Sequence, residues 1–299
     1  MELNIESKNV EEKYYPNGDI YKGTLINDLR EKKGTLIRNK TSSFISELKS
    51  AINHKLIIFY CADKESSKIK FPTQKINNIE IFYYEGDKYE GEFNKDLIEG
   101  KGVMTWINGN KYEGDFKNNF FDGEGRLTFA SQSYYQGHFK EGMQVGKGIF
   151  CYSNGDKYDG EWNNGLKEGQ GKYEYHNGDI YIGQWKNDFK EGNGVLLYAN
   201  KDKYEGNWEK NKRSGKGVYT YNNGDRYEGD WKNDKKEGEG VFIDRNGKYE
   251  GEWKNDMKDG KGSIFYNNGN IYDGFFRENH KVKGLGTLYD TLGNEIEDN

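Results

Sequence analysis

Aromatic and glycine residues alternate with charged and polar residues along most of this chain, and the alternation restarts at a fixed interval. In one example, Tyr204, Gly206 and Trp208 fall at every second position, with polar residues between them. Successive side chains of a β-strand point to opposite faces, so this spacing predicts a strand with one aromatic face and one polar face. A second alternating segment, residues 215–221, follows and leads into an Asn-Gly pair that is typical of tight turns. Each interval is therefore predicted to form one β-hairpin.

The interval is 23 residues long, with one step of 22. The tyrosines that open the successive repeats are Tyr89, Tyr112, Tyr135, Tyr158, Tyr181, Tyr204, Tyr227, Tyr249 and Tyr272. A fixed period of this size indicates a tandem array, in which each repeat buries one face against its neighbours. We therefore expect an all-β fold, an elongated single-layer antiparallel β-meander of tandem 23-residue hairpins.

The glycines share the face of the bulky rings, although glycine normally weakens a strand. A ring can lie flat over neighbouring backbone only where no Cβ intrudes. We therefore expect both glycines of each Gly-x-Gly segment, such as Gly215 and Gly217, to serve packing against rings. The segment 209–214, between the two strands of one hairpin, is expected to be a polar loop.

The order Tyr-x-Gly-x-Trp, then Gly-x-Gly, then Asn-Gly-Asp resembles the MORN (membrane occupation and recognition nexus) repeat. The aromatic residue that ends the first motif is Trp162, Trp185, Trp208, Trp231 or Trp253 in five repeats and Phe93, Phe116 or Phe139 in others. The resemblance covers residues 83–290 closely and 14–37 loosely. It implies a non-catalytic scaffold for protein assembly, often in cytoskeletal or ciliary structures such as radial spoke heads, and sometimes at membranes.

The repeat pattern divides the chain into five parts. They are an N-terminal arm (1–13), a first MORN-like repeat (14–37), a segment without clear motifs (38–82), the regular array (83–290) and a C-terminal tail (291–299). Two interpretations of residues 38–82 stay open. The period places two degenerate repeats there, whereas apolar residues at helical spacing favour an insertion with a short helix near 43–53. A helix packed on the sheet and followed by strands would satisfy both.

Composition narrows the classes of function. Hydrophobic residues make up 33% of the chain and charged residues 32%, which alone would favour disorder, but aromatic residues at 15% recur periodically and favour order. The net charge of −5, with acidic and basic residues interspersed, argues against nucleic acid as a partner. Two cysteines form no disulfide framework and no leader segment opens the sequence, so a cytoplasmic location is expected. The resemblance to MORN repeats further implies a location at the cytoskeleton, in a cilium or axoneme.

No group of residues in the sequence predicts catalysis. Acidic residues recur on the polar face, for example Glu205 and Glu228, and are expected to form solvated cross-strand ion pairs with nearby lysines. The four histidines have no partner at metal-ligand spacing. We therefore expect no enzyme, no metal and no cofactor.

Binding is expected where the sequence departs from the repeat and apolar residues replace lysine or asparagine. The candidate partner-binding residues are Trp106, Phe120, Phe121, Met143, Val145, Phe189, Phe275 and Phe276. The last repeat ends the sheet, and its edge strand is expected to be either a cap or a homodimer interface.

An alternative function is that of a membrane-associated adaptor. The segment 31–75 is locally basic, and clustered lysines attract anionic phospholipid headgroups. The contacts would be Lys32, Lys33, Lys68 and Lys70.

Overall fold

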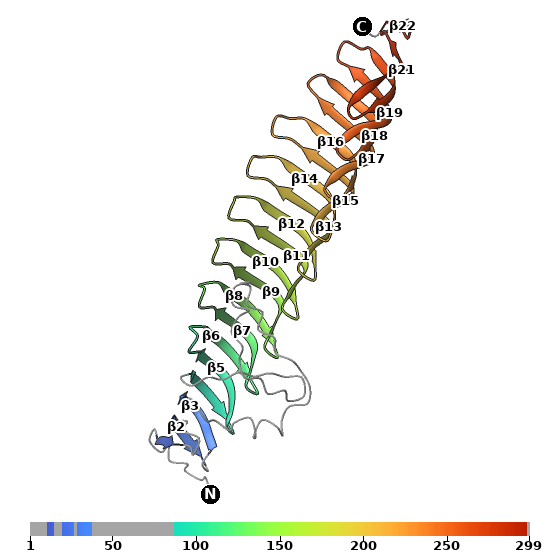
Figure 1. Ribbon diagram of the computed structural model, residues 1–299. Coiled ribbons are helices and arrows are strands. Elements are labelled where there is room, and N and C mark those ends of the chain that lie inside the picture. The colour runs from blue at the N-terminus through green and yellow to red at the C-terminus, as the bar shows by residue number, and fades with distance from the viewer. Residues whose placement is uncertain (1–10, 15–19, 27–28, 38–86, 298–299) are drawn as a thin grey trace. The chain divides into compact units, whose positions relative to one another are not determined.

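A computed structural model describes residues 11–14, 20–26, 29–37 and 87–297, and these residues form strands and turns without a helix (Figure 1). They belong to two compact bodies. The N-terminal body comprises Met1–Gly155 with Glu161–Leu166, and the C-terminal body comprises Asp156–Gly160 with Lys167–Asn299. The helix predicted near 43–53 lies outside the described residues.

The N-terminal body is an antiparallel meander. Its strands are β1 (Glu11–Tyr14), β2 (Ile20–Ile26), β3 (Leu29–Ile37), β4 (Lys88–Asn94), β5 (Leu97–Thr105), β6 (Lys111–Lys117), β7 (Phe120–Thr128), β8 (Tyr134–Lys140) and β9 (Met143–Cys151). Each strand pairs with the next, and β3 pairs directly with β4. The repeat that contains Tyr21 is therefore followed in the sheet by the repeat that begins at Tyr89.

The C-terminal body has the same topology, and Figure 1 shows its hairpins following one another in chain order. Strand β10 (Lys157–Asn163) contributes residues to both bodies. The later strands are β11 (Leu166–Glu174), β12 (Ile180–Lys186), β13 (Phe189–Leu197), β14 (Lys203–Glu209), β15 (Lys212–Thr220), β16 (Arg226–Lys232), β17 (Lys235–Asp244), β18 (Gly247–Lys254), β19 (Met257–Tyr266), β20 (Ile271–Arg277), β21 (His280–Tyr289) and β22 (Glu295–Ile296). From β11 onward each strand pairs antiparallel with the next. The predicted all-β meander of hairpins is confirmed.

A tyrosine ring over two facing glycines forms the centre of each regular hairpin. Tyr204 is 0% exposed, and its ring lies against Gly206 and Gly217, which are partners across β14 and β15. A Cβ atom on Gly217 would lie 2.6 Å from Cε2 of that ring. The ring hydroxyl donates a hydrogen bond to the backbone oxygen of Asn207 at 2.9 Å. The prediction that rings pack on bare backbone is confirmed for these glycines.

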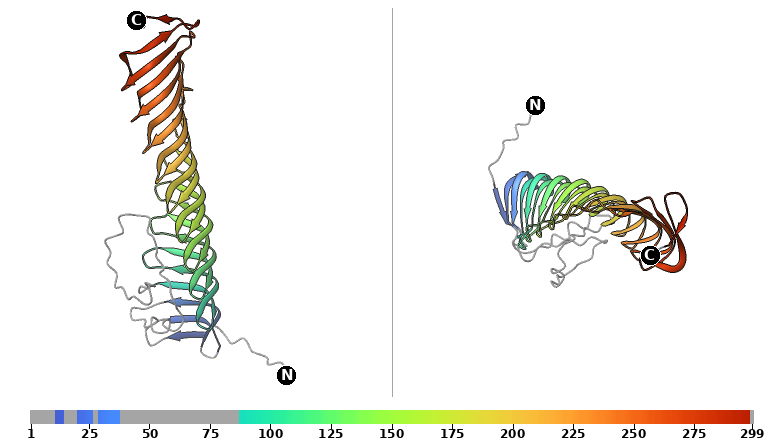
Figure 2. Two further views of the ribbon diagram at one scale, coloured as in Figure 1. Left: turned by 90° about the vertical axis from the view of Figure 1, so that its right-hand side faces the viewer. Right: turned by 90° about the horizontal axis from the view of Figure 1, so that it is seen from above.

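The first glycine of the Gly-x-Gly segment has a different role from the one predicted. Gly215 has a φ of +59°, and a Cβ there would lie near the side chain of Asn207 and not near a ring. Glycine adopts positive φ without the steric cost that other residues incur, so backbone conformation accounts for this position. Opposite it, the strand register shifts between Gly206 and Trp208, which is a β-bulge. Figure 2 shows that the strands are bent rather than straight.

Hairpin tips are shorter than predicted. Residues 209–214 are not a loop, because β14 and β15 are joined by Lys210 and Asn211 alone, with φ values of 48° and 71°. Two such residues form a turn whose twist matches that of the flanking strands. The Asn211 side-chain oxygen accepts a hydrogen bond from the backbone of Lys190 at 2.8 Å, and its own backbone N–H donates to the Lys190 carbonyl at 3.0 Å. Each tip is thereby tied to the preceding hairpin.

The opposite edge of the sheet has a matching connection. Asp202 precedes β14, and its carboxylate accepts a hydrogen bond from the backbone N–H of Asn222 at 2.8 Å. The Tyr219 hydroxyl donates to the same carboxylate at 2.7 Å. The last Asp of the Asn-Lys-Asp turn 200–202, like Asp156 and Asp179 in the Asn-Gly-Asp turns of earlier hairpins, therefore holds the next turn in place, so both edges carry a ladder of side-chain to backbone bonds.

Replacing Gly217 by alanine is expected to lower the free energy of unfolding by about 1–3 kcal/mol, because the added methyl group would overlap the Tyr204 ring. Urea denaturation followed by tryptophan fluorescence measures the change. Lys216→Ala, an exposed neighbour on the opposite face, is the matched control and should change the free energy by about 0.5 kcal/mol or less. Equal losses in the two variants would contradict ring packing as the reason for the glycine.

Candidate interaction surfaces

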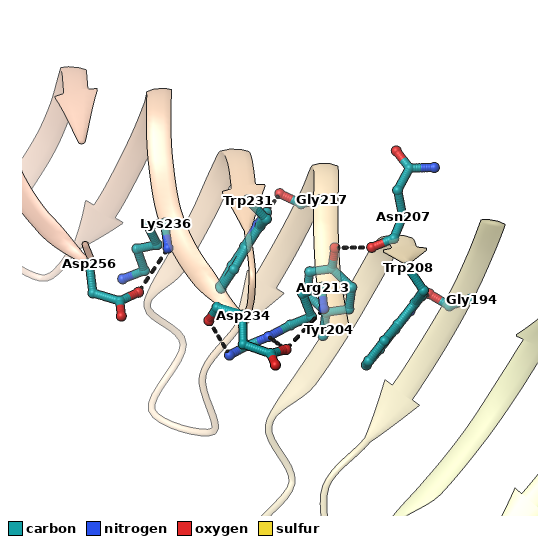
Figure 3. Close-up of polar contacts among 10 residues, drawn as sticks. All are labelled: Gly194, Tyr204, Asn207, Trp208, Arg213, Gly217, Trp231, Asp234, Lys236 and Asp256. Atoms are coloured by element: carbon teal, nitrogen blue, oxygen red, sulfur yellow. Dashed lines mark hydrogen bonds and ion pairs between the residues drawn. The ribbon is translucent and has the colours of Figure 1, made fainter. Parts of the chain in front are cut away.

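Five tryptophans, Trp162, Trp185, Trp208, Trp231 and Trp253, are buried in a closed aromatic layer and are not free for a ligand. Trp208 lies edge-on to Tyr181 and Tyr204, with ring centroids 5.3 Å and 5.2 Å away. Its Nε1–H donates a hydrogen bond to the Gly194 carbonyl at 3.2 Å, and Trp231 donates likewise to Gly217 at 3.1 Å (Figure 3). Trp208 is 4% exposed. Each tryptophan therefore joins its own hairpin to the preceding one, and edge-to-face contacts stabilise the layer.

A row of basic side chains covers this layer in the C-terminal body. Nζ of Lys190 lies 4.6 Å from the Trp208 ring centroid, and Cζ of Arg213 lies 4.3 Å from that of Trp231. The row consists of Lys167, Lys190, Arg213, Lys236, Lys258 and Lys281. The apolar stems of lysine and arginine cover ring surface, and their charges interact with the ring faces. Long basic side chains thus replace the second layer that a sheet of this kind lacks.

Polar residues at the hairpin tips anchor the row, and for Arg213 and Lys236 these residues are acidic. The Arg213 guanidinium donates to the Asp234 carbonyl at 2.7 Å and to its carboxylate at 3.3 Å (Figure 3). In the same way the backbone N–H of Lys236 donates to the Asp256 carboxylate at 2.8 Å. Arg213 is accordingly held in place over the rings.

Burial sets the protonation of these bases. Burial lowers the pKa of Lys190 to about 8, and this effect outweighs the opposing influence of the Asp234 and Asp179 carboxylates. Burial also lowers the pKa of Lys236 and of Lys258. For the tyrosines of the layer the direction is opposite, and burial raises the pKa of Tyr204.

The polar face carries ion pairs, and the predicted cross-strand pairs are among them. Lys216 of β15 and Asp230 of β16 are strand partners and pair at 2.8 Å. Other pairs lie within one strand, such as Lys203 with Glu205 at 2.6 Å and Arg226 with Glu228 at 2.7 Å, because residues two positions apart share a face. Exposed pairs of this kind contribute little to stability. The carboxylates of these pairs are solvated and lie beside cations, as expected from the sequence.

The polar face of the C-terminal body contains a shallow groove of about 770 Å³. Its lining includes Glu205, Glu228 and Glu250, with Val218 and Val241 between them. The strand register places these residues in one row, in which glutamate and valine alternate from strand to strand. Each kind of side chain therefore recurs once per hairpin.

The N-terminal body has a groove of similar size with a more balanced charge. Its volume is about 760 Å³. The charged residues that line it are Glu92, Lys101, Glu113, Glu124 and Arg126. Basic and acidic groups here lie side by side, so this groove is less acidic than the groove of the C-terminal body.

Hairpin β12–β13 has apolar residues at the positions where the next hairpin has the ion pair Lys203–Glu205. Ile182 pairs with Val195 and Ile180 pairs with Leu197 across the two strands. Ile182 is 47% exposed and Leu197 is 38% exposed. Phe189, at the start of β13, is 46% exposed. Phe189 lies at the other end of the hairpin, opposite Lys186. The apolar patch, defined as Ile180, Ile182, Val195 and Leu197, lies on a face that carries charged pairs in the next two hairpins.

Sequence reasoning named Phe189 of this hairpin but missed the four residues of the patch. The signal was present in the repeat, because the next hairpin has Lys203 and Glu205 where this one has Ile180 and Ile182. Comparison of the positions on either side of the opening tyrosine would have found it.

Two of the predicted partner-binding residues are buried, so the prediction that they expose apolar surface is wrong. Phe121 is 6% exposed and stacks on Tyr112 with ring centroids 3.7 Å apart. It takes the position that Lys190 and Arg213 take in later repeats. Phe276 is 3% exposed and fills the tryptophan position of its repeat.

The other predicted residues are divided between the two bodies. Phe275 is 46% exposed and, like Phe189, belongs to the C-terminal body. The partly exposed Trp106, Phe120, Met143 and Val145 belong to the N-terminal body. These six residues stay predictions as partner contacts.

The basic segment and the C-terminal edge also stay predictions. Lys32 and Lys33 lie in β3, opposite Phe93 and Glu92 of β4, while Lys68 and Lys70 lie outside the described residues. At the C-terminal edge, the two-residue strand β22 pairs with β21.

The described residues show neither a metal cluster nor a membrane-spanning helix. Within 11–14, 20–26, 29–37 and 87–297, no three or more His, Cys, Asp or Glu side chains are grouped so as to hold a metal ion. Over the same residues there is no helix of the length and apolar character needed to cross a bilayer.

Comparison with known proteins identifies the repeat. The family model described as MORN repeat matches eight consecutive segments, namely 89–111, 112–134, 135–157, 158–180, 181–203, 204–226, 227–248 and 249–271. A search of curated proteins finds no match.

Solved structures with some similarity to this chain include three domains, each 14% identical to it. The TCP domain of Drosophila melanogaster SAS-4, in complex with a proline-rich motif of Ana2, has a TM-score of 0.34 over 52% of this chain and 85% of that chain. A mutant TCP10 domain of Danio rerio CPAP has a TM-score of 0.38 over 66% and 98%. The G-box domain of CPAP has a TM-score of 0.35 over 60% and 100%.

Lys190→Met is expected to change how stability depends on pH. The pKa of Lys190 is about 8 in the folded protein against 10.5 for an ordinary lysine, so between these values the unfolded chain binds more protons and stability rises with pH. Methionine keeps an apolar stem but does not titrate. Any advantage of the variant in urea midpoint at pH 7 should therefore shrink toward pH 9.5. Ionisation of tyrosines, whose ordinary pKa is about 10, affects wild type and variant alike and does not alter this difference.

The matched control for this measurement is Lys232→Met, which removes an exposed lysine of the same body. It should leave the pH dependence of the urea midpoint unchanged. An identical pH dependence for wild type and Lys190→Met would contradict the effect ascribed to burial.

Proposed function

Because the chain belongs to the MORN repeat family, we propose that it is a non-catalytic scaffold that assembles other proteins, with the apolar patch of hairpin β12–β13 as its main contact. The observation that carries this proposal is the exposure of Ile182 and Leu197 on a face that carries the ion pairs Lys203–Glu205 and Arg226–Glu228 at the equivalent positions of the next two hairpins. Exposed apolar groups with a polar rim are typical of protein interaction sites.

The different roles of the two faces of the sheet support the proposed scaffold function. The aromatic face uses its rings and basic side chains to hold neighbouring hairpins together, as Trp208 and Lys190 do. The polar face contributes less to cohesion, since its side chains are exposed. Its residues can therefore differ between repeats without loss of the fold, which suits a surface that selects partners.

The proposed setting is a cytoplasmic assembly of the cytoskeleton, in a cilium or axoneme. Its support is the resemblance of the repeats. The phospholipid adaptor and the homodimer through the C-terminal edge remain predictions, and the described side chains favour the apolar patch over both.

The test replaces apolar residues of the patch by the charged residues that a regular repeat has at these positions. Ile180→Lys with Ile182→Glu recreates the Lys-Tyr-Glu order of Lys203 to Glu205, so folding should be preserved while the apolar surface is lost. Affinity purification from the native host with quantitative mass spectrometry should then show about a tenfold loss of the specifically bound proteins.

Ile271→Lys is the matched control, since it makes the same change at the same repeat position in β20. It should leave the set of bound proteins intact. Undiminished capture by the β12–β13 variant, with an unchanged circular dichroism spectrum, would show that the patch is not the contact.

A further inference from the structure

The groove of the C-terminal body presents the same chemical pair at every hairpin. Along the row that runs across the strands, Glu205, Val218, Glu228, Val241 and Glu250 are successive partners. A ligand that fits one hairpin therefore meets the same surface at the next. Such a surface favours a ligand that is itself periodic along its length.

The spacing of the row selects the kind of ligand. Neighbouring strands lie about 4.8 Å apart, so one hairpin advances about 9.6 Å. A polyproline II helix has three residues per turn and rises about 3.1 Å per residue, which gives about 9.3 Å per turn. Every third side chain of such a peptide therefore faces the same way and meets the same residue of successive hairpins.

Other peptide conformations match the row less well. A β-strand returns to the same face every second residue, at about 6.8 Å. An α-helix returns to nearly the same face after seven residues, at about 10.5 Å. Over three hairpins the helix drifts by about 3 Å, whereas the polyproline II helix drifts by about 1 Å.

The charges of the groove favour a basic ligand. Its lining contains four glutamates and one lysine, Lys216. The side chains of Glu205, Glu228 and Glu250 are 61%, 57% and 44% exposed, and each is held by one cation of its own strand. Exposed pairs of this kind are weak, so a ligand cation can share or replace the partner.

Apolar contacts complete the fit. Val218 and Val241 lie between the glutamates of the row, half-buried and facing the groove. The two residues of a polyproline II turn that carry no charge would pack on these valines. Proline suits both positions, because it is apolar and already prefers this conformation.

We propose that this groove binds a proline-rich peptide in the polyproline II conformation that carries lysine or arginine at every third position. The proposal rests on the scaffold function, since it names the chemistry of one partner segment. The groove of the N-terminal body is the weaker candidate, because Lys101 and Arg126 lie among its glutamates.

The test uses the full chain and a labelled synthetic peptide with five Arg-Pro-Pro triplets. Fluorescence anisotropy should show binding about tenfold tighter than for a peptide of the same composition with its arginines clustered at one end. Five Glu-Pro-Pro triplets should not bind. Equal affinity for the periodic and clustered peptides would show attraction by charge alone and would overturn the proposal, as would absence of binding.

Protein variants locate the site. Glu228→Gln with Glu250→Gln should weaken binding of the periodic peptide about tenfold, because both carboxylates line the groove. Glu90→Gln with Glu113→Gln is the matched control in the N-terminal body and should change the affinity less than about twofold. All four side chains are exposed or belong to exposed pairs, so folding is not at risk. The opposite ranking of the two variants would overturn the assignment.

Failure here is separable from failure of the scaffold function. Loss of partners in the β12–β13 variant, together with no preference for the periodic peptide, would leave the scaffold function standing and refute the groove's ligand. Retention of partners in that variant would refute the apolar patch, whatever the peptide does.

Discussion

The structure depends on the contact between one tyrosine ring and two glycines that face each other across a hairpin. The contact buries Tyr204 completely, in a protein whose described strands have no second layer to cover them. It also lies at the bulge, because the ring hydroxyl is bonded to the backbone of Asn207, the single residue of β14 that faces residues 214–216 of β15. Ring, bulge and turn are therefore parts of one arrangement, and a change in any of them disturbs the others.

Closure of the aromatic face leaves the polar face for variation. Trp208 links two hairpins and is covered by Lys190, so its ring serves to hold neighbouring hairpins together. In the N-terminal body Phe121 provides this cover by stacking on Tyr112. Apolar and basic residues are thus interchangeable as covers, provided that they are long enough to span the ring. No comparable restriction acts on Ile182 or Leu197, whose surroundings are open.

The fold was predictable from the sequence because the residue alternation and turn residues within each repeat indicate its strands and turns. The fixed period then indicates that the hairpins follow one another in one array. The burial of Phe121 and Phe276 was not predicted. The candidate partner-binding residues were chosen by residue type, and their positions within the repeat were not compared. Gly215 was assigned to packing, because composition alone does not separate a glycine under a ring from one with positive φ. The setting of Lys190 depends on a ring of the next hairpin, 18 residues away, and such a distance is not contained in the pattern of a single repeat.

The direct pairing of β3 with β4 has a consequence for the order of assembly. Five residues separate β5 from β6, whereas fifty separate β3 from β4. Gly34 of β3 pairs with Gly91 of β4, whereas Gly102 of β5 pairs with Gly114 of β6. Contacts between residues far apart in the chain form more slowly than local contacts. Hairpin β2–β3 is synthesised before β4, yet its pairing with β4 is the less local of these two pairings. We expect it to join the growing sheet after the local hairpins have formed.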